Sequence, residues 1–297
     1  IIGTLLVEAA GKSLLSPTLG MLGFAIALAL PFSLFAMFPQ WMKQAPKSGD
    51  WMTSFKVVLA FLELALSLKF LSVADLAYGW GILPRWLFIA IWIACFAGIG
   101  IYLLIHIKHI STTRKIIRAV VIIPSFAFAI YLIPGLWGAP VKAISAFAPP
   151  MEIAGREVFN DYDEGMQYAA AHRMPVMLDF TGYGCVNCRK MEAAVWTNPQ
   201  VSSLMKEKYV LITLYVDDKT PLPEKLVVKE NGVDVTLRTV GDRWSYLQRS
   251  KFGANAQPFY VLLDNDGHPL TGSYSYNEDV AAYRNFLEEG LQRYNQK

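Results

Sequence analysis

Long apolar runs fill the first half of the chain, and short apolar runs separated by polar turns fill the second half. A helix of about 20 apolar residues is long enough to cross a hydrocarbon core of about 30 Å. Four runs meet this length, at residues 18–38, 55–73, 86–107 and 116–133. A shorter run at residues 1–10 has the pattern of the tail of one more spanning helix. We therefore expect a polytopic α-helical membrane domain over residues 1–138.

The charges in the predicted loops set the orientation of these helices. Residues 40–56 contain three Lys against one Asp, and residues 108–118 contain four basic residues and no acidic one. The loop between them, residues 74–85, has one Asp and one Arg. Because basic loops stay in the cytoplasm, residues 140–297 should lie on the other side of a bacterial inner membrane, in the periplasm. The basic charge of the first half then indicates how the helices are oriented in a lipid bilayer. It does not indicate a nucleic-acid partner.

The second half has the pattern of a soluble α/β domain. Residues 1–150 carry 11 Lys and Arg against 4 Asp and Glu, whereas residues 151–297 carry 16 against 20. A linker with three prolines at residues 139–151 precedes a domain that we place at residues 152–297. We expect helices at residues 161–172, after Cys188, from Pro199, and at 244–251 and 278–294, and strands at 176–181, 209–216, 259–263 and 268–274. This order predicts a mixed sheet packed between helices.

A pair of cysteines two residues apart, Cys185 and Cys188, follows the first strong strand of this domain. The turn at residues 181–184 and the helix-forming residues after Val186 place Cys185 at a helix N-terminus, where thiolate is favoured over thiol. A zinc site would need a second pair of ligands, and haem attachment would need His where Arg189 stands. We favour a dithiol redox centre without metal or cofactor. The alternative is a structural disulfide, although so short a loop removes little entropy from the unfolded chain.

Three further residues of the soluble half are candidates for the same site. Pro258 stands directly before a predicted strand; it is either a proline tolerated at a strand's first residue or a cis proline facing the cysteines. Asp179 precedes the pair on its strand, and Glu192 follows it by one turn. Both carboxyls are candidate proton acceptors if they are buried, and the alternative for Glu192 is a solvated helix face.

Cys95 and Glu63 are the two residues of the membrane half with a candidate functional role. Cys95 lies in an apolar run and is predicted to be a small hydrophobe, not a redox partner. Glu63 lies near the middle of a predicted spanning helix, where a carboxyl is either functional or neutral and confined to helix packing.

Asp179-Phe180, the cysteine pair and Pro258 together resemble the thioredoxin fold. A longer set of motifs is similar to the C-terminal domain of the DsbD family of thiol:disulfide interchange proteins. The set is Val176-Met-Leu-Asp179, Cys185-Val-Asn-Cys188, Arg189-Lys-Met-Glu192 and Asn198-Pro-Gln-Val201. Pro46-Lys-Ser-Gly49 followed by Trp51-Met52, between two spanning runs, is similar to the membrane domain of the same family.

The resemblance implies a protein-disulfide reductase at the periplasmic end of an electron relay, linked to cytochrome c biogenesis. Electrons would pass from cytoplasmic thioredoxin through a membrane cysteine pair to Cys185 and Cys188, and then to periplasmic disulfide proteins. The chain departs from the family in three ways. Cys95 matches neither membrane cysteine, and the N-terminal periplasmic domain is missing, so the chain reads as truncated. The third departure is residues 217–242, which do not follow the family pattern. Within them, residues 225–239 predict a hairpin that either shapes partner choice or is a surface insertion.

Two rival functions follow from the same residues. One is a membrane-anchored oxidant or isomerase, and the other is a binding module with a structural disulfide. A simple anchor needs one helix, so four or five predicted spans count against both.

Overall fold

The computed structural model describes residues 50–107, 112–151, 158–230 and 232–296, with a few single residues between 22 and 37. The chain divides into two compact units, residues 1–56 and 57–297, and nearly all described residues belong to the second. The predicted run at residues 1–10 lies outside the described residues, and most of the run at 18–38 lies outside them too.

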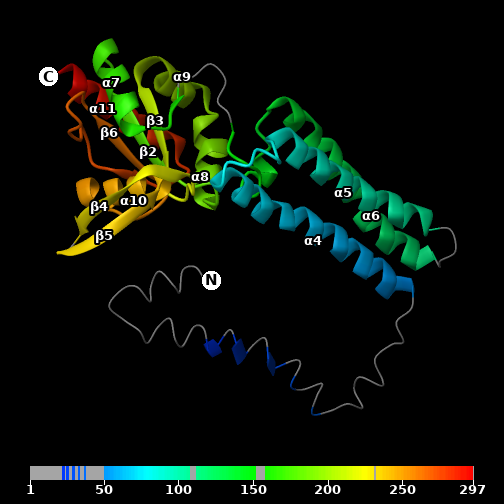
Figure 1. Ribbon diagram of the computed structural model, residues 1–297. Helices are drawn as coiled ribbons and strands as arrows, with labels where there is room; N and C mark the ends of the chain where they lie inside the picture. Colours follow the sequence, from blue (N-terminus) through cyan, green and yellow to red (C-terminus); the bar gives the residue numbers. More distant parts are fainter. Residues whose placement is uncertain are drawn as a thin grey trace. The chain divides into compact units, whose positions relative to one another are not determined.

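Three long helices form the first part of the described chain, α4 (Asp50–Ala77), α5 (Arg85–Ile105) and α6 (Thr112–Leu132) (Figure 1). Within the described residues, three segments are long and apolar enough to cross a membrane: Met52–Ala77, Arg85–Ile105 and Lys115–Trp137. They coincide with the predicted runs at 55–73, 86–107 and 116–133. The last segment continues past α6 through a 3-10 turn, η1 (Ile133–Trp137).

Apolar side chains from these helices pack into a common core. Ala65 and Leu68 of α4 meet Phe88 and Trp92 of α5, and Cys95 is buried in the same cluster, as predicted for a small hydrophobe. Glu63 is instead exposed on α4, so it is not buried among the described helices.

The soluble domain alternates strands and helices. A short 3-10 turn, η2 (Lys142–Ile144), precedes it. Its elements are β1 (Val158–Phe159), α7 (Tyr162–His172), β2 (Val176–Thr181), α8 (Val186–Met191), the π-helical turn η3 (Glu192–Trp196), α9 (Pro199–Lys208), β3 (Val210–Tyr215), β4 (Pro221–Glu230), β5 (Val233–Thr239), α10 (Val240–Phe252), β6 (Phe259–Leu263), β7 (Tyr274–Ser275) and α11 (Val280–Asn295).

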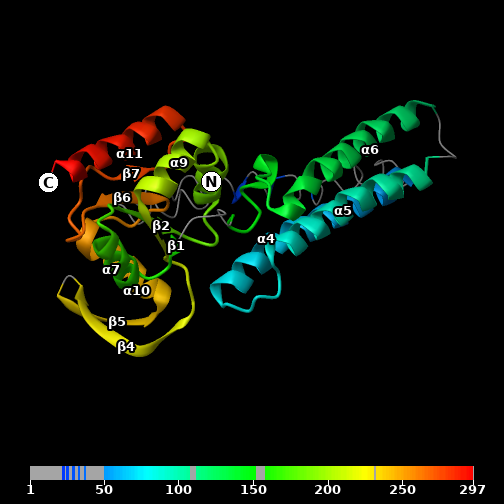
Figure 2. The ribbon, with the colours of Figure 1, turned by 90° about the horizontal axis from the view of Figure 1, so that it is seen from above.

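Five of these strands form one mixed sheet in the order β1-β3-β2-β6-β7. β1, β3 and β2 are parallel, whereas β6 runs antiparallel to β2 and β7 antiparallel to β6. Figure 2 shows α9 and α11 on one side of the sheet and α7 and α10 on the other. All six residues of β2 are buried, because this strand has a neighbour on each side and helices over both faces. The predicted thioredoxin-like α/β architecture is confirmed.

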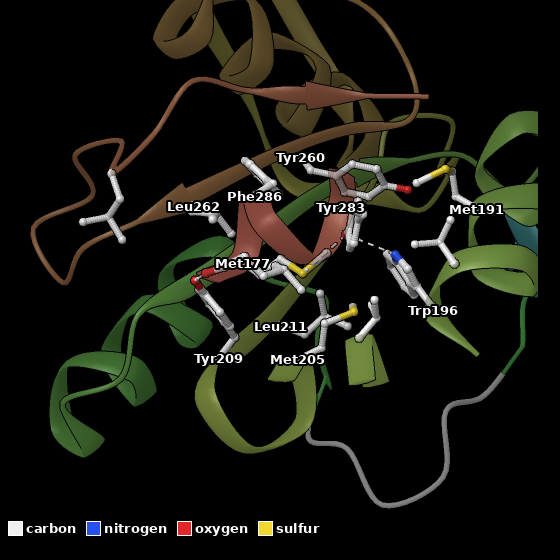
Figure 3. Close-up of a cluster of buried hydrophobic side chains, with 14 residues drawn as sticks. Met177, Met191, Trp196, Met205, Tyr209, Leu211, Tyr260, Leu262, Tyr283 and Phe286 are labelled. Carbon is white, nitrogen blue, oxygen red and sulfur yellow. Dashed lines mark hydrogen bonds between the residues drawn. The ribbon is translucent and has the colours of Figure 1, made fainter. Parts of the chain in front are cut away.

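Alternate residues of the central strands enter two separate cores. Met177 and Leu211 join the cluster under α9 and α11 (Figure 3), and Leu178 and Ile212 join the cluster under α7 and α10. In the first cluster the buried polar atoms are paired. The Trp196 indole N–H donates to the Tyr283 hydroxyl at 3.1 Å, and that hydroxyl lies 3.8 Å from the Met177 sulfur. Burying each large apolar side chain contributes about 1.5–3 kcal/mol to the free energy of folding. The packing of both cores therefore stabilises the strand that leads to the cysteine pair.

Two sequence predictions about element limits were inaccurate. The predicted strand at residues 268–274 is reduced to a bridge between Pro269 and Leu263 and to β7. Asp264 accepts the backbone N–H of His268 at 2.8 Å to close the turn, and Pro269 has no N–H with which to extend a ladder. Helix α10 begins four residues earlier than predicted, because Thr239 forms a reciprocal capping box with the third residue of the helix.

The hairpin predicted at residues 225–239 is present as β4 and β5, a separate two-stranded sheet. Gly232 in its turn has a φ of 82°, a left-handed conformation that glycine adopts without strain. Glu230 at the end of β4 accepts two bonds from the Arg249 guanidinium of α10, at 2.6 and 3.0 Å. The hairpin is thereby fixed to the domain at its far end.

Candidate active site

Cys185 and Cys188 form a disulfide at the end of β2, with their Cα atoms 5.3 Å apart. Cys185 is the N-cap of α8, and its sulfur accepts the backbone N–H of Cys188 at 3.1 Å. Val186 beside it is exposed, whereas Cys188 is only 2% exposed. Cys185 itself is half-buried and lines an open groove, whereas Cys188 lies inside the domain.

The turn that leads into Cys185 is held by a side chain from the next strand. Asp217 follows β3, and its carboxylate accepts the backbone N–H of Tyr183 at 2.9 Å and of Gly184 at 3.0 Å. β2 and β3 are parallel neighbours, so their carboxyl ends meet at one edge of the sheet and bring these segments together. The Tyr183 ring also stacks on Tyr215, with centroids 4.0 Å apart. The approach to the cysteine pair is therefore fixed by both hydrogen bonds and ring packing.

Gly241 allows the segment around Asp217 to lie close to α10. A Cβ atom at this position would lie 2.6 Å from the carbonyl oxygens of Val216 and Asp218. Only glycine permits this approach of helix to loop.

Pro258 lies directly across from the cysteine turn. The Gln257–Pro258 peptide bond is cis, and the pairing of Phe259 with Phe180 places it beside the end of β2. Gln257 lines a groove of about 350 Å³ together with Cys185 and Asp217. The Gln257 side-chain amide donates to the oxygen of Gln248 at 3.1 Å, which ties this loop to α10.

A buried ion pair lies directly after the cysteine pair. The Arg189 guanidinium is 2.8 Å from the Glu192 carboxylate, and their side chains are 2% and 9% exposed. The same guanidinium nitrogen donates to the Thr181 hydroxyl at 3.1 Å. Glu192 is thus an interior residue, and the solvated-face alternative is wrong. Its carboxylate is surrounded by Arg189, the Met151 backbone, Arg85 and Lys69.

Asp179 lies beneath α8 on β2 and is 2% exposed. Its neighbours across the sheet are Thr213 on β3 and Tyr260 on β6. Among the described residues, none forms a hydrogen bond with its Oδ1 atom. Burial, and then the nearby Glu192 carboxyl, raise the pKa of Asp179 well above its usual range, although Arg189 acts in the opposite direction. Asp179 is therefore a stronger proton acceptor than an exposed carboxyl.

The pKa of Glu192 is also raised, chiefly by burial. Four groups oppose this rise because they favour the carboxylate. They are Arg189, the backbone N–H of Met151, Arg85 and Lys69. Burial also raises the pKa of the neighbouring Tyr215 to about 12. The site therefore contains two carboxyls with raised pKa values behind an accessible sulfur.

Of the five residues that the sequence predicted for the site, Cys185 and Cys188 are joined by the disulfide. Asp179 and Glu192 are close enough to influence each other's charge, and Pro258 lies beside the end of β2. Their roles in the reaction stay predictions. Sequence reasoning did not assign a role to Arg189, Tyr215 or Asp217. The spacing of Arg189 three residues before Glu192 was a usable signal, since such pairs face each other on a helix. Asp217 directly follows a strong strand, a position where functional side chains gather in parallel sheets.

Comparisons with known proteins agree with this geometry. A model of a thioredoxin-like family matches residues 157–265. The thiol:disulfide interchange protein DsbD of Cronobacter sakazakii (strain ATCC BAA-894) is 30% identical over 181 residues, which cover 60% of this chain and 29% of that protein. DsbD of Vibrio vulnificus (strain YJ016) is 28% identical over 219 residues, 71% of this chain and 33% of that protein. The predicted resemblance to these proteins is confirmed.

This chain spans only about a third of the length of these relatives. Among solved structures, a thioredoxin from Thermus thermophilus is 20% identical, with 46% of this chain and 86% of that one covered and a TM-score of 0.33.

Proposed function

We propose that this chain is a thiol:disulfide oxidoreductase that reduces disulfides of other proteins through Cys185 and Cys188. The observation that carries the proposal is the disulfide itself, with one sulfur next to an open groove and the other buried in front of two carboxyls with raised pKa values. The similarity to DsbD proteins supports the same reaction. A binding module with a purely structural disulfide would need neither the groove nor the buried carboxyls.

The reaction begins from the reduced pair. The Cys185 thiolate attacks a partner disulfide, forms a mixed disulfide and releases one partner thiolate, which takes a proton from solvent. Cys188 then loses its proton to the buried carboxyls and attacks the Cys185 sulfur. The Cys185–Cys188 disulfide forms, and the second partner thiolate leaves and is protonated. Two protein thiols are thus oxidised, and one partner disulfide is reduced to two thiols.

The N-cap position of Cys185 favours its thiolate, because the backbone N–H of Cys188 points at the sulfur. Asp217 orients the turn, and the cis Gln257–Pro258 segment forms the opposite wall of the groove. We assign Asp179 and Glu192 as proton acceptors for Cys188. Arg189 is a positioning residue, because its guanidinium binds the Glu192 carboxylate and the Thr181 hydroxyl.

We further propose that the domain faces the periplasm from a bacterial inner membrane and that it is the outer end of a relay fed by cytoplasmic thioredoxin. The basic loops support this orientation, and the three spanning helices support the membrane location. A relay through the bilayer needs a pair of thiols that can close and open. Cys95, buried among apolar side chains, has no second cysteine near it within the described helices.

The mixed disulfide provides the test. A Cys188→Ala variant of the full chain in detergent should accumulate mixed disulfides with a disulfide-bonded peptide, because Cys185 can attack but nothing completes the exchange. Non-reducing gels and mass spectrometry identify the linked residue. A Cys95→Ala variant serves as the matched control and should turn over like the parent. Trapping that requires Cys188 and survives Cys185→Ala would reverse the assigned roles.

A further inference from the structure

Two openings with different lining residues lie near the cysteine pair and the carboxyls behind it. The first is the groove that Cys185 shares with Asp217 and Gln257. The second is a cavity of about 900 Å³ that is lined by Glu192 but by neither cysteine. Glu192 does not line the groove, and Cys185 does not line the cavity.

The cavity reaches the carboxyls through a row of polar side chains. Glu192, Thr213 and Tyr215 all line it. Thr213 is the β3 partner of Asp179 in the parallel ladder, so both side chains point to the same face of the sheet. Asp179 does not itself line the cavity. Thr213 is therefore a polar residue that both lines the cavity and neighbours Asp179, the innermost carboxyl.

The proposed exchange makes a second opening necessary. When a partner is joined to Cys185, the groove holds the partner, and Cys188 is buried beneath it. The proton that leaves Cys188 at this stage must pass from the carboxyls to water by another way.

We propose that this proton leaves through the cavity, from the Asp179 and Glu192 carboxyls past Thr213, and not through the partner groove. This inference rests on the proposed disulfide exchange and adds a proton exit to it. The wall beyond Glu192 supports it, because the cavity carries further polar groups suited to water, Asn160, Asp75 and Arg85.

Charged and titratable groups surround both carboxyls. Around Glu192 they are Arg189 of α8, Arg85 of α5, Lys69 of α4 and the Met151 backbone N–H. Around Asp179 they are Glu192, Arg189, Tyr215 of β3 and Tyr260 of β6. The cations on the Glu192 side favour loss of the proton from Glu192, whereas Asp179 deeper inside favours its uptake.

Two substitutions test the exit without touching the cysteines. Val158→Trp places a bulky ring in the cavity from β1, an edge strand where Val158 is 40% exposed. Thr213→Val keeps the side-chain volume and removes the hydroxyl. Val227→Trp is the matched control, because it makes the same change on β4 at a residue that is 65% exposed and does not line the cavity. Thr213→Ser should restore the wild-type behaviour.

The assay follows the mixed disulfide of the reduced full chain with a disulfide-bonded peptide by rapid acid quench and mass spectrometry. We expect wild-type rates of formation in all variants. Decay should slow about tenfold in Val158→Trp and Thr213→Val, a part of the roughly 10²–10⁴-fold that positioned proton transfer contributes. The pH profile of the decay rate should shift, while the equilibrium redox potential of the cysteine pair stays unchanged.

Decay at the wild-type rate in both variants would overturn the proton exit. Equal slowing of formation and decay, or a changed redox potential, would also overturn it, because it would indicate general distortion. If no mixed disulfide forms even in the wild type, the proposed function itself fails, and this result is distinguishable from the others.

Discussion

Replacing Arg189 by Met tests how the buried charges behind the cysteine pair are held. The substitution keeps most of the side-chain volume but removes the cation that lies 2.8 Å from Glu192 and the donor to Thr181. Both partners of the pair are almost completely buried, so water cannot replace the lost interaction.

The expected loss follows from the geometry. Two unit charges about 4 Å apart attract by about 4 kcal/mol at an effective dielectric constant of about 20. Removing one partner of a buried pair typically costs about 3–5 kcal/mol, because an uncompensated charge remains. We expect a loss of this size in the free energy of local opening at β2 and α8.

The loss should depend on pH with a definite sign. Without Arg189, the pKa of Glu192 rises further, since burial already raises it and Arg189 is the largest opposing influence. A carboxyl whose folded pKa lies above its unfolded value of about 4.3 destabilises the fold progressively as pH rises through that interval. Arg189→Met should therefore differ little from wild type in acid and should differ most in alkaline solution.

Hydrogen–deuterium exchange of the full chain in detergent, read from peptides covering β2 and α8, measures this free energy locally. The double variant Arg189→Met/Glu192→Gln should recover most of the loss and show little pH dependence. Arg293→Met is the matched control, since its pair with Glu289 is 2.6 Å long but more than half exposed, and it should cost less than about 1 kcal/mol. An Arg189→Met loss as small as that of Arg293→Met, or a double variant no better than the single one, would refute the reasoning.

Two other predictions concern the site and its orientation. Asp179→Asn should increase the free energy of unfolding at neutral pH by about 1–3 kcal/mol, because an unsatisfied buried carboxyl with a raised pKa is replaced by a neutral group. It should also slow the decay of the mixed disulfide. Thermal unfolding measures the first effect and peptide turnover the second, and a variant that is no more stable than wild type and turns over equally fast would contradict the prediction. After reduction, an impermeant thiol reagent should label Cys185 in intact cells; labelling only after lysis would place the domain in the cytoplasm.

Local chemistry was enough to predict much of the soluble domain. The apolar strand before Cys185, the Asn198-Pro199 helix start and the hairpin of β4 and β5 each follow from short-range rules that tertiary contacts did not override. Apolar length alone predicted the three described spanning helices. Where the sequence prediction was inaccurate, at residues 268–274, the hydrogen bond from the His268 N–H to the Asp264 carboxylate and the missing N–H of Pro269 ended the strand.

By itself, the sequence determined which residues are close along the chain: the cysteine pair, its helix, and the carboxyls on either side of it. Only the tertiary structure decided their surroundings. Periodicity left Glu192 either buried or solvated, and long-range packing makes it an interior partner of Arg189. Asp217 reaches the cysteine turn from 33 residues away because parallel strands end at one edge of the sheet. The cavity behind Glu192 likewise exists only because distant segments pack around it, a long-range property that no local pattern in the chain encodes.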